Sequence, residues 1–183
     1  MTSKNSFTFD YILRKATPAD AKALRALIRE AMSSYCVDSN ISPDILESMH
    51  ESEEDIAIKT TKRDVLVLSA EATGELLGTI TLHQIPSPSP RATIKDGYVE
   101  NVLYISRFAV CNSLRGTGLG VMLIDEAYNT AKSLGLSKLV LHTAITNKGM
   151  VDFYIKRGFE LVSSDNSRGY ERGLFEADVS NCD

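Results

Sequence analysis

The sequence predicts a single α+β domain built around a mixed β-sheet. The length of 183 residues suits one domain, and 43% hydrophobic and 24% charged residues are typical of a globular chain. The local patterns run strand, helix, helix, and then strand, strand, strand, helix, strand, helix, strand, strand, an order typical of α+β folds. We expect a flexible tail over residues 1–10 and one folded domain over residues 11–177.

The N-terminal part begins with a β-prone run at residues 11–14 and continues into a helix. Thr17 can cap this helix, Pro18 suits its first position, and Asp20 stands where a capping box places an acid. Apolar residues follow at helical spacing: Leu24, Leu27, Ile28 and Ala31. A second helix is expected over residues 42–52, where a thin apolar stripe indicates a mobile cover.

The central part predicts a β-hairpin followed by a loop and a long strand. Residues 65–70 and 76–85 are the two arms of the hairpin, with a turn at Thr73-Gly74-Glu75 between them. Three prolines within residues 86–90 exclude regular structure there. The long strand is expected over residues 98–110.

The C-terminal part predicts two further helices and three strands. A helix over residues 118–134 has an apolar stripe and is closed by Gly135. A strand over 138–144 and a short helix over 148–157 follow. The chain is expected to finish with an antiparallel pair of strands, 159–163 and 170–175.

Charge and cysteine content exclude several functional classes. Twenty Lys and Arg against twenty-four Asp and Glu give a net charge of −4, which argues against a general nucleic-acid-binding protein. Cys36, Cys111 and Cys182 form no CxxC pattern, so we expect reduced thiols in a cytoplasmic protein with no metal site and no disulfide framework. No apolar run reaches the roughly 18 residues of a membrane span, and residues 1–10 lack the features of a signal peptide.

The most specific motif is Leu114-Arg115-Gly116-Thr117-Gly118-Leu119-Gly120, which lies between a predicted strand and an amphipathic helix. Glycines allow positive φ angles and a close approach of the backbone to a ligand. The start of the helix presents free N–H groups and the positive end of the helix dipole, and Arg115 adds a charge. The motif therefore predicts a phosphate cradle for a ligand that carries a pyrophosphate.

Three known phosphate cradles compete for this motif. A P-loop requires Lys and Ser or Thr after the glycines, and neither follows here. A dinucleotide fold requires GxGxxG after the first strand of a parallel βαβ unit, whereas this GxGxG spacing comes late in the chain. The third pattern is arginine, two residues, glycine, one residue, glycine, and Arg115, Gly118 and Gly120 match it.

On these residues the sequence resembles the GNAT superfamily of N-acetyltransferases. The first matching block is Ser106-Arg107-Phe108-Ala109-Val110 with the glycine motif, and the second is Asn147-Lys148-Gly149-Met150-Val151-Asp152-Phe153-Tyr154 with Lys156-Arg157-Gly158-Phe159. The resemblance covers about residues 11–175. It implies a three-layer α/β/α fold whose mixed, mostly antiparallel sheet splays between the strands 98–110 and 138–144.

The resemblance implies acetyl-CoA as cosubstrate and direct attack by a primary amine in a ternary complex. The main chain of Phe108, Ala109 and Val110 would pair with the pantetheine arm, and an amide at or near Val110 would polarise the thioester carbonyl. The pyrophosphate would lie against the cradle, with the assigned residues Arg115, Gly116, Thr117, Gly118, Leu119 and Gly120. Arg157 and Asn147 are also assigned to the cofactor, although Asn147 fits a helix N-cap equally well.

The resemblance places Tyr154 as the general acid that protonates the departing thiolate, with a core aromatic as the alternative interpretation. The general base stays open. Alternation along the strand puts Glu100, Val102, Tyr104, Ser106 and Phe108 on one face, so Glu100 and Tyr104 could share a water molecule. Some histone acetyltransferase relatives carry a catalytic Glu where this chain has Tyr104, and Glu100 could simply be a solvated charge. The isolated strand histidines, His83 and His142, are assigned no role.

The acceptor amine stays open between a small amine, an amino acid and a peptide N-terminus. Its identity is expected to depend on the helix 42–52, the acidic run 51–55 and the loop 86–97. The acidic run could attract a cationic amine or simply form a solvated face. The alternative function is a non-catalytic acyl-CoA sensor of the same fold, and the resemblance also allows a homodimer.

Overall fold

The computed structural model describes residues 10–85, 93–94, 97–98 and 102–181. The predicted tail lies, apart from Asp10, outside the described residues. The same holds for the proline-rich loop 86–90 and for Glu100.

Seven strands form one sheet in the order β1-β2-β3-β6-β7-β9-β8, and every neighbouring pair is antiparallel except β6 and β7. The strands are β1 (Tyr11–Lys15), β2 (Asp64–Ala70), β3 (Leu76–Ile85), β6 (Val102–Val110), β7 (Lys138–Ala144), β8 (Glu160–Asp165) and β9 (Arg172–Asp178). A separate two-stranded ladder joins β4 (Thr93–Ile94) and β5 (Gly97–Tyr98). The predicted hairpin and the final antiparallel pair are confirmed.

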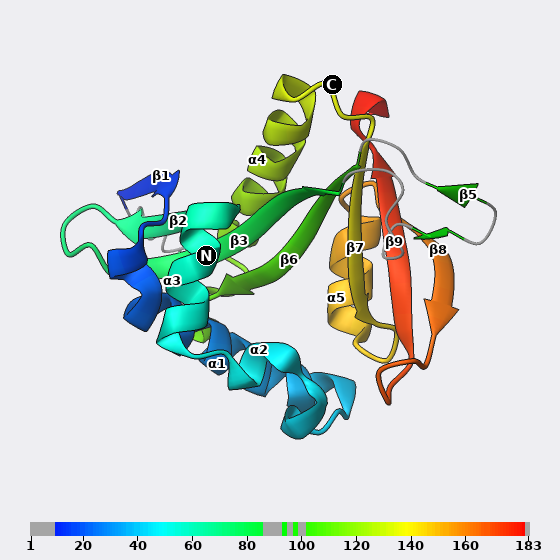
Figure 1. The fold of residues 1–183 in the computed structure, drawn as a ribbon, viewed down its shortest axis with the longest axis horizontal. Helices are drawn as coiled ribbons and strands as arrows, with labels where there is room; N and C mark the ends of the chain where they lie inside the picture. Colours follow the sequence, from blue (N-terminus) through cyan, green and yellow to red (C-terminus); the bar gives the residue numbers. More distant parts are fainter. Residues whose placement is uncertain (1–9, 86–92, 95–96, 99–101, 182–183) are drawn as a thin grey trace, which may run out of the picture.

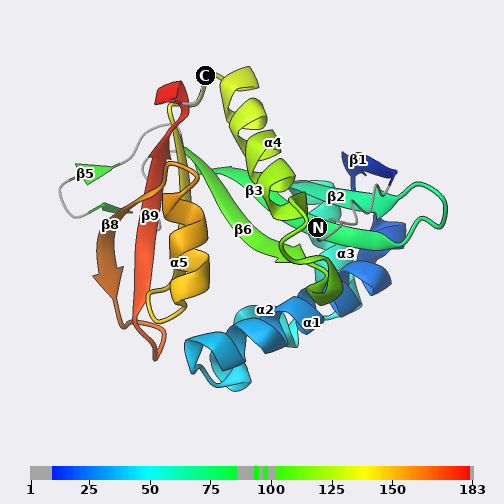
Figure 2. The ribbon, with the colours of Figure 1, turned by 180° about the vertical axis from the view of Figure 1, so that it is seen from behind.

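Helices cover both faces of the sheet and complete three layers (Figures 1 and 2). On one face lie α1 (Ala21–Ser39), α2 (Glu47–His50) and α3 (Glu53–Lys62), and on the other lie α4 (Leu119–Ser133) and α5 (Lys148–Ile155). The larger core cluster joins α4 and α5 to the strands, and a second cluster joins α1 and α3 to β2, β3 and β6. The predicted α+β class and three-layer arrangement are confirmed. No helix of the described ranges is long and apolar enough to cross a membrane.

The sheet splays between β6 and β7. Their parallel pairing runs from Val102 opposite Lys138 to Ile105 opposite Leu141 and then stops, although β6 continues to Val110 and β7 to Ala144. Figure 1 shows the two strands separating beyond this point. Backbone groups on the facing edges of these ends are therefore left without a partner strand, as the resemblance implies.

A β-bulge interrupts β6 at the splay. Thr79 of β3 lies opposite Ala109, whereas Thr81 lies opposite Ser106, so β6 holds one extra residue between these pairs. Arg107 adopts a φ of 51° in the bulge, a left-handed value that is rare for a residue with a side chain. The extra residue reverses the alternation, and Phe108 packs into the α4-side core instead of sharing a face with Tyr104. The predicted common face is therefore wrong at Phe108.

The segment between α1 and β2 differs from its prediction. The expected single helix over 42–52 is replaced by a 3-10 turn, η2 (Pro43–Ile45), and the four-residue α2. The ten-residue α3 was not predicted at all. Ser52 and Asp55 form a reciprocal capping box at its start, with the Ser52 N–H donating to Asp55 at 2.9 Å and the Asp55 N–H donating to Ser52 at 3.1 Å. The acidic residues that follow Ser52 thus begin a helix.

The first helix extends far enough to reach the splay. Its predicted start is confirmed, because Asp20 accepts from the Thr17 N–H at 2.8 Å in a capping box that opens with a 3-10 turn, η1 (Pro18–Asp20). From there α1 runs for 19 residues and ends at Asn40, which adopts a φ of 54°. Its last turns therefore carry Tyr35, Asp38 and Ser39 to the open end of β7.

Candidate active site

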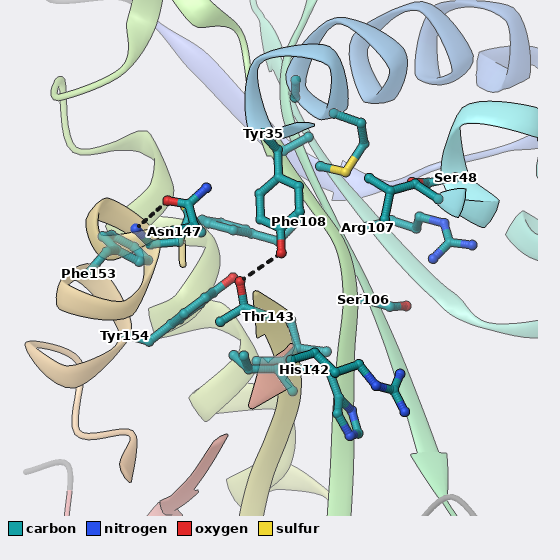
Figure 3. Close-up of a pocket in the computed structure, with 18 of the residues that line it drawn as sticks. Tyr35, Ser48, Ser106, Arg107, Phe108, His142, Thr143, Asn147, Phe153 and Tyr154 are labelled. Atoms are coloured by element: carbon teal, nitrogen blue, oxygen red, sulfur yellow. Dashed lines mark hydrogen bonds between the residues drawn. The ribbon is translucent and has the colours of Figure 1, made fainter. Parts of the chain in front are cut away.

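The divergence of β6 and β7 opens a cavity of about 890 Å³, within the range of ligand-binding pockets. Its walls come from the second half of α1, the segment 45–48, the unpaired end of β6, the start of α4, β7, α5 and the β8–β9 hairpin. Figure 3 shows side chains from several of these elements converging on this space.

Most predicted site residues that the structure describes line this one cavity: Tyr104, Phe108, Ala109, Val110, Arg115, Gly116, Gly118, Gly120, Asn147 and Tyr154. Three others do not line it. The Thr117 hydroxyl donates to the Leu114 carbonyl at 2.7 Å, and the Leu119 side chain is buried in the core. Arg157 follows α5, where its carbonyl accepts from the Tyr128 hydroxyl at 2.7 Å.

The glycine loop forms an open turn at the start of α4. Gly116 and Gly118 have φ angles of 80° and 98°, and a Cβ added to either would meet no atom within 4 Å. These glycines are therefore required by the backbone conformation and not by crowding. No side chain caps α4 at Gly118, so its first-turn N–H groups have no acceptor within the helix. Arg115, half exposed, lies 4.0 Å from Asp38 at the same place. This end of the cavity suits an anion.

An apolar wall connects the glycine loop to Tyr154. A Cβ added to Gly120 would lie 3.2 Å from the Phe108 ring and 3.6 Å from the Phe153 ring. These two rings stack with their centroids 5.7 Å apart. The Tyr154 ring continues the wall at 6.2 Å from Phe108 and 5.5 Å from Phe153. A long ligand could therefore run from the loop to the Tyr154 hydroxyl along one surface.

Tyr154 combines a buried ring with a hydroxyl at the cavity. The residue is 5% exposed, and its side chain points toward Thr143 and Tyr35 (Figure 3). Burial raises the pKa of Tyr154 above its ordinary value, and the nearby phenols of Tyr35 and Tyr104 act in the same direction. The phenol therefore stays protonated at neutral pH. The ring thus takes the core position that the sequence left open, and the catalytic role of the hydroxyl stays a prediction.

The end of α1 contacts β7 beyond the point where β7 stops pairing with β6. The Tyr35 hydroxyl accepts from the Ala144 N–H at 2.6 Å and lies 3.2 Å from the Thr143 hydroxyl (Figure 3). Asn147 accepts from the Met150 N–H at 3.1 Å and donates to the Ser39 hydroxyl at 3.0 Å. The N-cap interpretation of Asn147 is thereby confirmed. These bonds connect the end of α1 to β7 and to the start of α5 beside the splay.

A phenol and two imidazoles lie together on the other side of the splay. The Tyr104 hydroxyl is 2.9 Å from Nδ1 of His142, and the ring centroids of Tyr104 and His83 are 5.1 Å apart. Burial, together with the positive charge of Arg172, lowers the pKa of His142 to about 4. The imidazole is therefore neutral at physiological pH, which allows its Nδ1 to accept a hydrogen bond from the phenol.

Sequence reasoning missed both histidines because their position depends on strand register. His83 lies directly opposite Tyr104 on β3. Val140 lies opposite Tyr104 on β7, and His142, two residues later, shares its face. Each histidine alone gives no signal, but once the strands are aligned the three polar rings lie on one face.

Protonation of His142 should make the protein less stable in acid. Its folded pKa of about 4 lies below the ordinary value of 6.5, so between these values the folded protein binds fewer protons than the unfolded chain. Stability from this group is complete above pH 6.5 and is lost as the pH falls. Between pH 7.5 and pH 5 the loss should be about 2 kcal/mol. Urea unfolding of His142→Gln should show a pH dependence smaller by this amount; equal pH dependence in both proteins would contradict the assignment.

A buried ion cluster lies beside the bulge. Glu51, with 5% of its side chain exposed, accepts from Arg107 Nε at 2.9 Å and Nη2 at 2.6 Å, and it also pairs with Lys59. Glu47 lies 3.5 Å from Arg107. Burial and the charge of Arg107 lower the pKa of Lys59 to about 8. Glu51 is thus neither a solvated charge nor free to attract a cationic amine.

Comparison with known proteins agrees with this geometry. The acetyltransferase (GNAT) family model matches residues 23–159. A curated relative, the probable N-acetyltransferase san of Drosophila melanogaster, is 32% identical over 78 residues, which are 42% of this chain and 41% of the relative. The matched part is therefore less than half of that relative's length.

Solved structures show the same fold at low sequence identity. The PaiA N-acetyltransferase of Thermoplasma acidophilum, in complex with coenzyme A, has a TM-score of 0.71 and 20% identity, covering 92% of this chain and 99% of that chain. A GNAT-family acetyltransferase of Listeria monocytogenes has a TM-score of 0.70 and 20% identity, covering 94% and 96%. A spermidine N-acetyltransferase chimera from Vibrio cholerae has a TM-score of 0.66 and 19% identity, covering 93% and 96%. With the family model spanning most of the sequence, the chain belongs to the GNAT acetyltransferase family.

Proposed function

We propose that this protein is an acetyl-CoA-dependent N-acetyltransferase that acetylates a primary amine by direct attack in a ternary complex. The observation that carries the proposal is the continuity of one cavity from the glycine loop, along the unpaired end of β6, to the Tyr154 hydroxyl. The coenzyme A complex of the Thermoplasma relative supports the same cosubstrate here.

The pyrophosphate of acetyl-CoA is assigned to the start of α4. Gly116, Gly118 and Gly120 offer backbone N–H groups there, and Arg115 offers a partly exposed guanidinium. Thr117 and Leu119 can contribute only through the main chain, because their side chains are engaged elsewhere. Arg157 is left without a place in this assignment, since it does not line the cavity.

The pantetheine arm is assigned to the unpaired edge of β6. The Cys111 N–H donates to the Leu77 carbonyl of the preceding hairpin at 2.9 Å. Successive N–H groups point to opposite sides of a strand. Because the Cys111 N–H points toward β3, the N–H of Val110 points away from β3, toward the gap between β6 and β7. This group is the proposed donor to the thioester oxyanion. Asn147 keeps one amide hydrogen beyond the one given to Ser39, and this hydrogen is available to the arm.

Acetyl transfer then requires one proton to leave the amine and one to reach sulfur. The amine nitrogen attacks the carbonyl carbon, the oxyanion is held by the Val110 N–H, the carbon–sulfur bond breaks, and Tyr154 protonates the thiolate. We assign the acceptance of the amine proton to Tyr104, whose hydroxyl would take this proton while passing its own to Nδ1 of the neutral His142. Glu100 is the alternative base.

Tyr154→Phe should lower kcat by about 10- to 100-fold, because the thiolate would leave without an acid. The Kd for acetyl-CoA should stay unchanged, since the ring and its packing are retained. Stopped-flow release of the CoA thiol measures the first quantity and calorimetry the second. Tyr11→Phe, at an exposed position on β1, is the matched control. Full activity of Tyr154→Phe would remove it as the acid.

The base is tested by comparing two variants in the same assay. Tyr104→Phe should lower kcat by at least about tenfold, whereas Glu100→Gln should leave the pH–rate profile as it is in the wild type. The opposite result, a large loss in Glu100→Gln alone, would transfer the base to Glu100.

The proposed activity is tested by incubating the protein with acetyl-CoA and a panel of amines and by following thiol release. Turnover on any member supports an enzyme. Tight acetyl-CoA binding without turnover on every member would favour the sensor alternative. A cytoplasmic location is part of the proposal and is supported by the free thiols of Cys36 and Cys111.

A further inference from the structure

We infer that the acceptor is an amine that also carries an anionic group, a carboxylate or a phosphate, and that Arg172 of β9 binds this group, with Arg168 of the β8–β9 hairpin beside it. The inference rests on the proposed acetyl transfer in the same cavity. It names the chemical class of the second substrate, which the family assignment leaves open.

Positive charge predominates on the side of the cavity away from the glycine loop. Among the described residues, five cationic side chains line this side: Lys59, Arg63, Arg107, Arg168 and Arg172. Two acids line it, Glu47 and Asp165, and Glu51 adds a third behind the wall. Glu51 holds Arg107 and Lys59. At the hairpin, Arg168 lies 3.6 Å from the exposed Glu47, and Arg172 pairs with Asp165 through its Nε.

Arg172 presents unused donors to the cavity. Its side chain is 17% exposed, and its Nε donates to the two carboxylate oxygens of Asp165 at 3.3 and 3.1 Å. Neither terminal amino group of the guanidinium has a hydrogen-bond acceptor in the described part of the chain. Asp165 therefore orients the guanidinium through one edge and leaves its terminal fork free. Such a fork matches the two oxygens of a carboxylate or phosphate.

The pKa values of two groups at the cavity, His142 and Lys59, respond to the nearby positive charges. Burial lowers the pKa of His142, and the charges of Arg172 and Arg168 lower it further, whereas Asp165 raises it. Burial likewise lowers the pKa of Lys59, with Arg107 and Arg63 contributing and Glu47 opposing them. A positive potential attracts an anion and also favours the unprotonated, nucleophilic form of a bound amine. A polyamine would instead bring a second cation into this field.

The position of Arg172 suits an acceptor that spans the site. Arg172 lies opposite Ala144 on β7, and Leu174 lies opposite His142, so Arg172 is beside the strand that carries the partner of Tyr104. An anion held there would leave the amine end of a small molecule free to reach the splay between β6 and β7.

The hairpin also meets the segment before α3 across the cavity. Glu47 lies 3.5 Å from Arg107 and 3.6 Å from Arg168, and a Cβ on Gly169 would lie 3.8 Å from Ile45 Cδ1. These contacts bridge the cavity and favour a small acceptor over a polypeptide.

The first test uses matched pairs of amines in the thiol-release assay. Each amino acid is compared with its carboxamide, and glucosamine 6-phosphate with glucosamine; spermidine represents the polyamines. In a pair that is acetylated, we expect kcat/KM to be at least tenfold higher for the anionic member. Whether this difference occurs in the amino acid pairs or in the glucosamine pair shows whether the bound anion is a carboxylate or a phosphate. Faster turnover of the neutral members or of spermidine would overturn the inference.

The second test changes Arg172. Arg172→Gln should raise KM for the anionic acceptor at least tenfold and lower kcat/KM for its neutral partner far less, and Arg172→Lys should recover part of the loss. Arg29→Gln, on the exposed face of α1, is the control. An equal loss for both members of a pair would indicate a merely structural role and overturn the inference.

A binding measurement tests whether Arg172 binds an anion even if no amine in the panel is acetylated. Protein saturated with CoA, which fills the proposed phosphate cradle, is titrated with inorganic phosphate and with acetate. Saturable binding of either anion that weakens at least tenfold in Arg172→Gln is expected. No saturable binding, or equal binding in the variant, would overturn the inference. Failure of CoA itself to bind would instead refute the proposed function.

Discussion

Gly118→Asp is expected to weaken acetyl-CoA binding by about a hundredfold or more, because like charges brought together at a binding site cost several kcal/mol. The new carboxylate would stand at the start of α4, where the proposed cradle places the pyrophosphate. Open space surrounds Gly118, so the carboxylate would fit without displacing protein atoms. Calorimetric titration with CoA measures the effect.

A second substitution separates charge from backbone strain. Gly118 has a φ of 98°, which is unfavourable for any residue with a side chain, so Gly118→Ala carries the strain without the charge. We expect Gly118→Ala to bind CoA much more tightly than Gly118→Asp. If both variants fold and both bind CoA as the wild type does, the pyrophosphate does not lie at this loop.

Glu51→Gln is expected to lower the free energy of unfolding by about 3 kcal/mol, because breaking a buried ion pair leaves an uncompensated charge. The glutamine keeps the shape of the side chain but not the charge that balances Arg107 and Lys59. Glu47, with 63% of its side chain exposed, is too solvated to replace it. Denaturant unfolding gives the value.

The matched control for this variant lies three residues away. Glu54 is exposed on the first turn of α3, so Glu54→Gln should change stability by at most about 0.5 kcal/mol. Because Arg107 forms the bulge that precedes Phe108, loss of Glu51 should also weaken acetyl-CoA binding. Equal stability of the two variants would show that the cluster does not stabilise the fold.

The parts of the site that the sequence could predict are those encoded locally. The conformation of the glycine loop depends on residues that are adjacent in the sequence, because the positive φ angles at Gly116 and Gly118 favour glycine. The Asn147 N-cap and the aromatic pair of Phe153 and Tyr154 are local in the same sense. For these features no knowledge of strand pairing was needed.

The parts that the sequence could not predict depend on contacts between distant segments. The bulge at Arg107 is defined by the register of β6 against β3, and it reversed the face expected for Phe108. The Tyr104–His142 contact joins residues 38 positions apart. Arg107 and Glu51 are 56 positions apart, and their pairing explains why an acidic residue in a charged run is buried.

The most direct test of the central claim is calorimetric titration of the full chain with acetyl-CoA, CoA, ATP and NAD. We expect saturable binding of acetyl-CoA and CoA and no comparable binding of ATP or NAD. The cradle is joined to an apolar wall and a splay that suit a pantetheine arm, and neither nucleotide carries such an arm. Binding of ATP or NAD with no binding of acetyl-CoA would contradict the cofactor assignment and every catalytic role derived from it.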